Sequence, residues 1–117
     1  MEILDLLTND AKYLLASMYK AYVEKRKAGS LKKDASHFGS VDNLHHDLMS
    51  EWPVEDVLST CYELKKHGLI SGTLTSGTFF RIFITTEAIA IMESRFKDRV
   101  DSILDYASKI EGLIPFF

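Results

Sequence analysis

ELKKHGLISGTLTSGTFFRIFITTEA, residues 63–88, is the stretch of sequence that decides the fold. It begins with a cationic helix end and a glycine, the residue with which many helices stop. Two short apolar runs follow on either side of the tetrapeptide TSGT, and their β-branched and aromatic residues favour strands. Threonines that can cap a helix close the stretch. Together these features predict a helix, a β-hairpin and another helix in direct succession.

One helix is expected near the N-terminus, well before this stretch. Thr8 or Asn9 can cap it, and its apolar residues recur at helical spacing until Gly29 stops it. The segment 29–40 contains glycines and serines but no helical stripe. We therefore expect a loop there, with a very short strand at residues 36–38.

Two more helices are expected between this loop and the hairpin. Ser40 is a typical N-cap for a short helix over residues 41–49. Pro53 suits the first turn of the next helix, because its missing N–H has no intrahelical partner there, and Gly68 ends that helix. Trp52 lies in the turn between the two helices, where it either packs onto the core or anchors a partner.

Two helical segments are predicted after the hairpin. Thr85 or Thr86 restarts a helix through residues 88–97, and a second amphipathic segment ends at Gly112 and Pro115. The order of three helices and a hairpin is that of a winged helix, a relative of the helix-turn-helix. The predicted fold class is mainly α with a small β-hairpin (α+β): one winged helix-turn-helix domain over residues 1–117, with 99–117 as a C-terminal helical extension.

The composition limits the class of protein. The chain has 117 residues, of which 46% are hydrophobic, enough for one globular domain with a buried core. Cys61 is the single cysteine and cannot form an internal disulfide, and the N-terminus lacks the basic start of a secretory signal. No apolar run reaches the roughly 20 residues that cross a bilayer. We expect a cytoplasmic protein without a membrane span.

Positive charge is concentrated in one part of an acidic chain. The net charge is −3, but residues 20–33 contain six basic residues and one acidic residue. Such a run is either a solvated helix end or a patch that binds phosphate groups. The predicted phosphate contacts of this basic patch are Lys25, Arg26, Lys27, Lys32 and Lys33.

Double-stranded DNA is the first expected partner, because a helix-turn-helix places its second helix in the major groove. Predicted contacts from that helix are Ser59, Tyr62, Lys65 and Lys66, and from the wing Thr75, Ser76, Thr78 and Arg81. Glu55 and Asp56 at the helix start argue against sequence-specific base contacts, because carboxylates repel phosphates. The alternative to a winged-helix transcriptional regulator is therefore a protein-interaction module, in which Glu55, Asp56 and Glu63 meet a basic partner.

The C-terminal segment carries more apolar residues than a minimal winged helix buries. We expect a homodimer through an amphipathic helix, with an interface of Ile103, Leu104, Ala107, Ile110 and Ile114. Two alternatives remain open: this helix folds back onto its own chain, or the final residues 113–117 anchor the protein at a membrane surface, which the nearby acidic residues disfavour.

Catalytic and metal-binding patterns are missing from the sequence. The four histidines and Cys61 lack the spacing of a zinc site, and there is no phosphate-binding glycine loop or nucleophile elbow. Cys61 lies on an apolar helical stripe and is expected to be a core residue. The sequence predicts a protein that is not an enzyme and that needs neither cofactor nor metal.

Three segments also resemble a known group of proteins: ASHFGS at 35–40, PVEDVLSTCYELKKHGLI at 53–70 and ITTEAIAIMESRF at 84–96. Over roughly residues 8 to 110 the chain resembles small uncharacterised winged-helix proteins of Gram-positive bacteria and their prophages, including the YjcQ-type proteins. The resemblance implies a winged-helix fold and a regulatory role. It carries no established ligand or site, and the acidic start of the helix after Pro53 departs from well-characterised winged-helix repressors.

Overall fold

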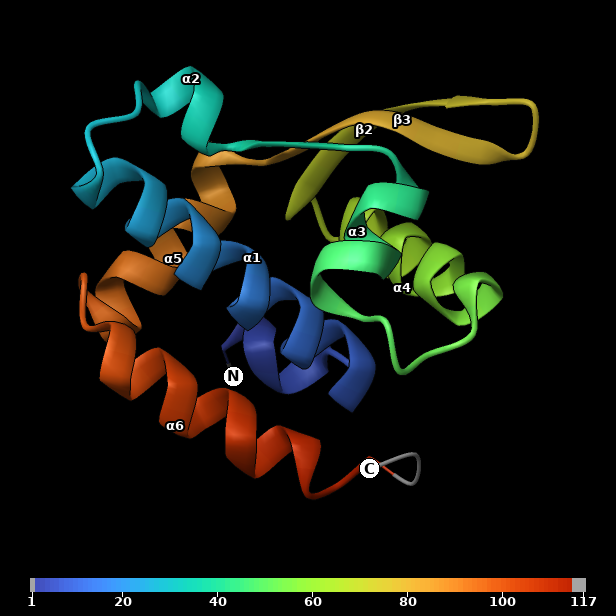
Figure 1. Cartoon of the computed structure of the whole chain (residues 1–117). Helices are drawn as coiled ribbons and strands as arrows, with labels where there is room; N and C mark the ends of the chain where they lie inside the picture. The colour runs from blue at the N-terminus through green and yellow to red at the C-terminus, as the bar shows by residue number, and fades with distance from the viewer. Residues whose placement is uncertain (1, 115–117) are drawn as a thin grey trace.

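Helices pack against one face of a small antiparallel sheet in the computed structural model, which describes residues 2–114 (Figure 1). Within this range the chain forms a 3₁₀ helix, six α-helices and three strands. In chain order they are η1 Ile3–Leu6, α1 Asn9–Lys27, α2 Lys32–Ala35, β1 His37–Gly39, α3 Val41–Leu48, α4 Val54–Lys66, β2 Ile70–Thr75, β3 Thr78–Ile84, α5 Thr86–Phe96 and α6 Val100–Glu111.

Side-chain caps start three of the helices where the sequence predicted them. The Thr8 hydroxyl accepts a hydrogen bond from the Ala11 N–H at 3.3 Å, and the Thr85 hydroxyl caps α5 in the same way. Ser40 forms a reciprocal capping box at the start of α3. Each cap satisfies a backbone N–H that the helix leaves without a partner. Pro53 occupies the N-cap of α4, one residue earlier than predicted.

The segment expected to be a loop contains more structure than its sequence indicated. One turn of helix, α2, lies within it, and the strand β1 begins one residue later than predicted. Ala35 explains the turn, because this small residue is completely buried and draws the chain onto the core. A single buried position produces no periodicity, so the pattern of apolar residues could not show the turn. The hairpin thereby becomes part of a three-stranded sheet.

The sheet is antiparallel with strand order β1-β3-β2. Ser76 and Gly77 both have positive φ, 52° and 76°, at the tight turn of the hairpin, as tight two-residue hairpin turns require. Farther along, the register of β2 with β3 shifts between Ser71 and Thr73. Opposite this shift Arg81 has a φ of 55°, and Phe80 and Arg81 are both exposed. The bulge therefore brings two consecutive side chains to the outer face of the sheet.

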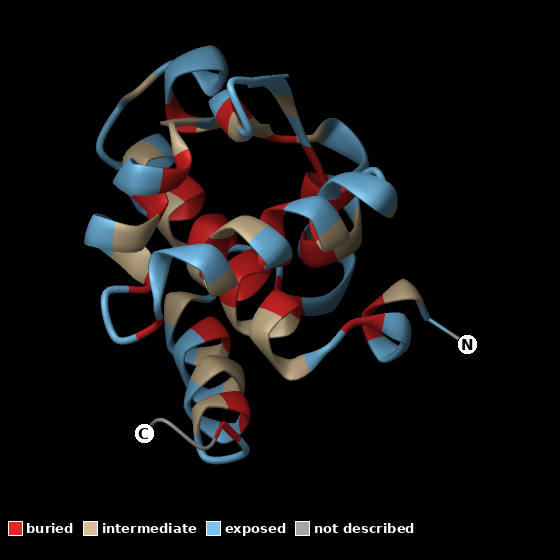
Figure 2. Ribbon diagram, turned by 90° about the vertical axis from the view of Figure 1, so that its right-hand side faces the viewer, coloured by how far each residue is buried: buried red, intermediate tan, exposed pale blue. Residues whose placement is uncertain are grey.

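Helix α1 runs through the middle of the molecule and supplies the largest share of the buried residues of any helix (Figure 2). α6 lies along one side of α1 and α4 packs on another, while the inner face of the sheet packs against α3 and α4. The rings of Trp52 and Tyr13 are 4.9 Å apart, and Trp52 is buried, so it fastens the turn before α4 to α1. The result is a mixed α+β fold around one hydrophobic core.

Candidate nucleic-acid interface

The outward side of α4 carries the residues predicted to touch DNA. Ser59, Tyr62 and Lys66 are exposed and follow helical spacing, so they form one stripe, and Lys65 is exposed beside it. Tyr62 is 45% exposed, and its ring meets the ring of Phe79 in β3 edge-on at 4.9 Å. The stripe therefore adjoins the hairpin. Glu55 is exposed in line with it, at the start of the helix.

The hairpin tip is polar and uncharged. Thr75 and Ser76 are exposed, and Thr78 is half-buried. Leu74 is exposed opposite the buried Phe79, so the side of the hairpin that faces α4 ends in an apolar residue. The α4 stripe and the hairpin tip together form a nearly neutral surface with hydroxyl groups at one end and lysines at the other.

Arg81, the one cation predicted for the wing, lies elsewhere. It lines a hollow of about 480 Å³ with Lys33 of α2, His37 of β1 and Phe83 of β3, and Asp34 stands at the same hollow. The rings of His37 and Phe83 are 4.7 Å apart. The structure thus joins Arg81 to part of the basic patch on the outer face of the sheet, while α4 packs on the inner face.

The three cations at the end of α1 are engaged within the chain. Lys25 lies 4.5 Å from the centre of the Phe38 ring, and Arg26 donates a hydrogen bond to the Ser30 carbonyl at 3.1 Å. Lys27 donates to the Asp98 carbonyl at 2.9 Å and lies 3.9 Å from its carboxylate. Lys32 and Lys33 are exposed in α2. The basic run is therefore not one open patch.

The opposite end of α1 is the one that meets α4. Glu63 of α4 accepts hydrogen bonds from the Thr8 N–H at 2.8 Å and the Thr8 hydroxyl at 2.6 Å. The 19 residues of α1 span about 28 Å. The cationic end consequently lies on the far side of the molecule from the α4 stripe (Figure 1). The cations at the end of α1 and the residues of the α4 stripe, all predicted to touch DNA, therefore do not lie on one surface.

Glu63 also changes the alternative prediction. It was expected to face a basic partner with Glu55 and Asp56, but its carboxylate is bound to Thr8 at the positive end of α1. Glu55 is exposed and Asp56 is half-buried. A basic partner of α4 would therefore meet Glu55 first, with no carboxylate from Glu63.

Most of the predicted dimer contacts are covered by the chain itself. Ile103, Ile110 and Ile114 are buried, and Ala107 is half-buried, because α6 folds back along α1. Leu104 is 47% exposed. Folding back, which the sequence left open, accounts for these isoleucines. The alternative of a membrane anchor rests on residues 113–117, of which Pro115, Phe116 and Phe117 lie outside the described residues.

Cys61 is completely buried, and burial raises the pKa of its thiol to about 12. A thiol with that pKa is protonated at neutral pH and is a poor nucleophile. Among residues 2–114, no group of three His, Cys, Asp or Glu side chains is placed to hold a metal ion. In the same range no helix is long and apolar enough to cross a membrane.

Comparison with known proteins adds no relative. No family model matches the sequence, no curated protein matches it, and no solved structure matches the fold. The resemblance to YjcQ-type proteins therefore stays a prediction.

One group of residues was missed by the sequence analysis. Tyr19 and Tyr22 of α1 line a pocket together with Glu93 of α5 and with Arg26, which was predicted only as a phosphate contact. No local motif could have indicated it, because its walls come from segments about 70 residues apart. This pocket lies at the cationic end of α1, away from the α4 stripe.

Proposed function

We propose that the protein is a cytoplasmic winged-helix regulator that binds double-stranded DNA through the α4 stripe and the hairpin tip. The observation that carries the proposal is the combination of chain order and strand order. A strand follows the first long helix, two helices joined by a short turn come next, and the hairpin returns so that β3 pairs with both other strands. This arrangement is expected of a winged helix, in which the hairpin stands beside the second helix of a helix-turn-helix.

Binding is expected to be modest and to depend on phosphate contacts. Lys65 and Lys66 supply positive charge at one end of the α4 stripe, and Thr75 and Ser76 offer hydroxyl donors at the hairpin tip. Phosphate contacts position a protein on DNA without specifying sequence. Glu55 at the start of α4 weakens contacts with base edges. We propose binding by the single chain, because three of the five residues predicted for a dimer interface are buried within it.

The test is fluorescence anisotropy of a labelled mixed-sequence DNA duplex at low and near-physiological salt. We expect binding at low salt that weakens steeply as salt rises. The plot of log affinity against log salt has a negative slope. Changing Lys65 and Lys66 together to Gln should make this slope less steep by about 2, one unit for each phosphate contact.

Lys32 and Lys33 provide the matched control, because they are adjacent exposed lysines in α2 on another surface. Their double change to Gln should leave the slope unchanged. Equal effects of the two double variants would show non-specific attraction rather than an α4 interface. Absence of binding at low salt would refute the proposed function.

A second candidate is a protein-interaction module, favoured by the exposed apolar residues on the same surface. Tyr62 and Leu74, which both lie beside Phe79, are each more than two-fifths exposed, as are side chains that anchor a partner. If DNA does not bind, this surface remains the place to look. Tyr62→Ala then becomes the variant to compare with the unmodified chain against candidate basic partners.

A further inference from the structure

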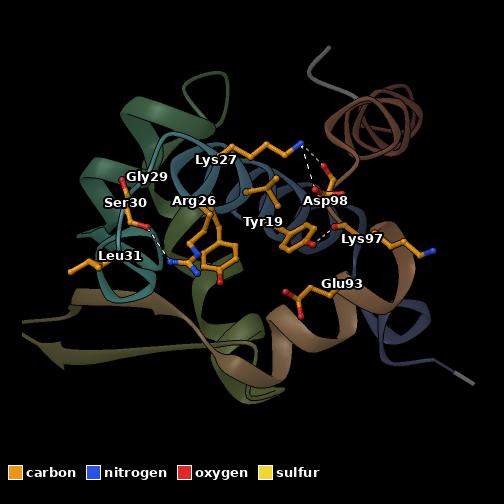
Figure 3. Close-up of a pocket in the computed structure, with 11 residues that line it drawn as sticks. Tyr19, Arg26, Lys27, Gly29, Ser30, Leu31, Glu93, Lys97 and Asp98 are labelled. Carbon is orange, nitrogen blue, oxygen red and sulfur yellow. Dashed lines mark hydrogen bonds and ion pairs between the residues drawn. The ribbon is translucent and has the colours of Figure 1, made fainter.

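A pocket of about 680 Å³ opens between the end of α1, the loop of residues 29–31 and the end of α5 (Figure 3). Pockets of this size commonly bind small molecules. We propose that this pocket binds a small zwitterion: a molecule with an ammonium group, a carboxylate and an apolar body, such as an amino acid or a dipeptide. The proposal is independent of DNA binding, because the pocket lies away from the α4 stripe.

The apolar body would rest on two tyrosines. Tyr19 and Tyr22 are stacked with their ring centres 6.2 Å apart, and both line the pocket beside Val23. Leu31 also lines the pocket, and 70% of its surface is exposed. Both tyrosines are already buried, so an apolar group placed between them and Leu31 would remove mainly its own surface and that of Leu31 from water. This burial supplies a driving force that does not depend on charge.

Arg26 is the group that would bind the carboxylate. Its side chain is held by the hydrogen bond from Nη1 to the Ser30 carbonyl, which uses one of the five N–H donors of a guanidinium. The remaining donors can pair with a carboxylate, for which the planar guanidinium is well suited. Lys27 is less available, because it already binds the carbonyl and carboxylate of Asp98.

Glu93 is the group that would bind the ammonium. It comes from α5, on the other side of the opening from Arg26 in Figure 3. Its carboxylate has neither a hydrogen bond nor an ion pair with any described residue. It lies near enough to Tyr19 to add to the rise in the pKa of that hydroxyl, which burial mainly causes. A carboxylate at the edge of a pocket attracts a cation by charge.

The pocket also touches the corner that joins α5 to α6. The Tyr19 hydroxyl donates to the Lys97 carbonyl, and Lys27 donates to the Asp98 carbonyl at 2.9 Å. The backbone of Lys97 has a φ of 55°, a conformation that residues other than glycine adopt at a cost in free energy. α1 therefore holds this corner in place. A ligand bound to both Arg26 and Glu93 would add another link between α1 and α5 and would stabilise the folded chain.

The test is a titration of the full chain with L-phenylalanine and with the dipeptide L-leucyl-L-phenylalanine, which differ in the separation of their two charges. Binding is followed by NMR chemical shifts and by the melting temperature. We expect at least one probe to bind at millimolar concentrations or below, with shifts concentrated at the pocket residues and a higher melting temperature. The N-acetyl and C-terminal amide forms of that probe should each bind at least tenfold more weakly, since each lacks one charge.

Matched variants assign the two charges to residues. Arg26→Gln and Glu93→Gln should each weaken binding at least tenfold. Arg99→Gln and Glu87→Gln, which change the same charges outside the pocket, should leave it unchanged. A specific site with a millimolar dissociation constant would be largely occupied at a probe concentration of about 10 mM. Failure of both probes to bind at that concentration would overturn the proposal. So would equal binding of the charge-blocked forms, or binding that survives both pocket variants.

Discussion

Helices α4 and α6 are both amphipathic and were both predicted to bind another molecule, but they differ in which of their faces the rest of the chain buries. α6 turns its apolar stripe onto α1 of its own chain, so Ile103 and Ile110 are buried. α4 also buries an apolar stripe, but it displays a second side, with Tyr62 and Lys66, beside the hairpin. The comparison teaches that an amphipathic pattern shows that a helix has a partner without showing whether the partner is its own chain.

The largest effect is expected where α6 meets α1. Ile103→Ala should lower the free energy of unfolding by about 3 kcal/mol, because it leaves a cavity in a completely buried site. Leu104→Ala, the adjacent exposed position, should lower it by less than about 1 kcal/mol. Urea denaturation of both variants measures the difference.

A different outcome would revise the comparison. If Leu104→Ala were the more damaging change, or if it alone changed the sedimentation coefficient, α6 would use its exposed side in a dimer. In that case the predicted homodimer would return, with Leu104 rather than the buried isoleucines at its centre.

A smaller effect is expected where α4 meets α1. Glu63→Ala removes two hydrogen bonds to Thr8 and a negative charge at the start of α1. We expect a loss of about 1–2 kcal/mol of stability, limited by the partial exposure of the site. Glu55→Ala, on the exposed side of the same helix, should change stability by about 0.5 kcal/mol or less. Thermal denaturation of both variants provides the measurement.

Thr8→Ala sharpens this prediction through a double-mutant cycle. If Glu63 acts through Thr8, the two changes together should cost less than the sum of their separate costs. Additive costs would mean that Glu63 stabilises the chain by another route.

The smallest effect is expected at the corner that leads into α6. Tyr19→Phe removes the hydrogen bond to the Lys97 carbonyl and should cost about 1 kcal/mol at neutral pH. Burial, followed by the charge of Glu93, raises the pKa of Tyr19 from 10.0 to about 12. The folded state therefore holds this proton more tightly than the unfolded state. The stabilisation is complete below pH 10 and is lost as the pH rises from 10 to about 12.

The measurement is denaturant stability at several pH values between 8 and 12, a range in which Cys61 also contributes. Tyr19→Phe should lose less stability across this range than the unmodified chain. An identical decline in both proteins would show that other groups, with Cys61 first among them, account for the alkaline sensitivity.

Local signals in the sequence were sufficient for most of the fold. Caps at Thr8, Ser40 and Thr85 act within one helical turn, so their residue types predict the helix starts to within one residue. The hairpin turn at Ser76 and Gly77 is equally local. α2 was not predictable, because a single buried alanine holds it and leaves no pattern.

The candidate site was predictable only in part, since most of its contacts join distant segments. The α4 stripe follows from helical spacing, and the prediction of its exposed residues depended on that spacing alone. The placement of Arg81 and Lys33 at one hollow depends on how the sheet meets α2, and the pocket of Arg26 and Glu93 depends on how α1 meets α5. Spacing along the chain carries no information about such pairs.

The sequence by itself determined most of the helices and strands, with α2 the exception, because capping, periodicity and turn chemistry act over a few residues. Only the tertiary structure decided which face of each helix is buried and which side chains from distant segments lie together. It turned Ile103 inward, bound Glu63 to Thr8, and separated the cations of α1 from α4 by the length of a helix. The physical reason is that burial and ion pairing depend on distances between segments, which are settled when the whole core packs.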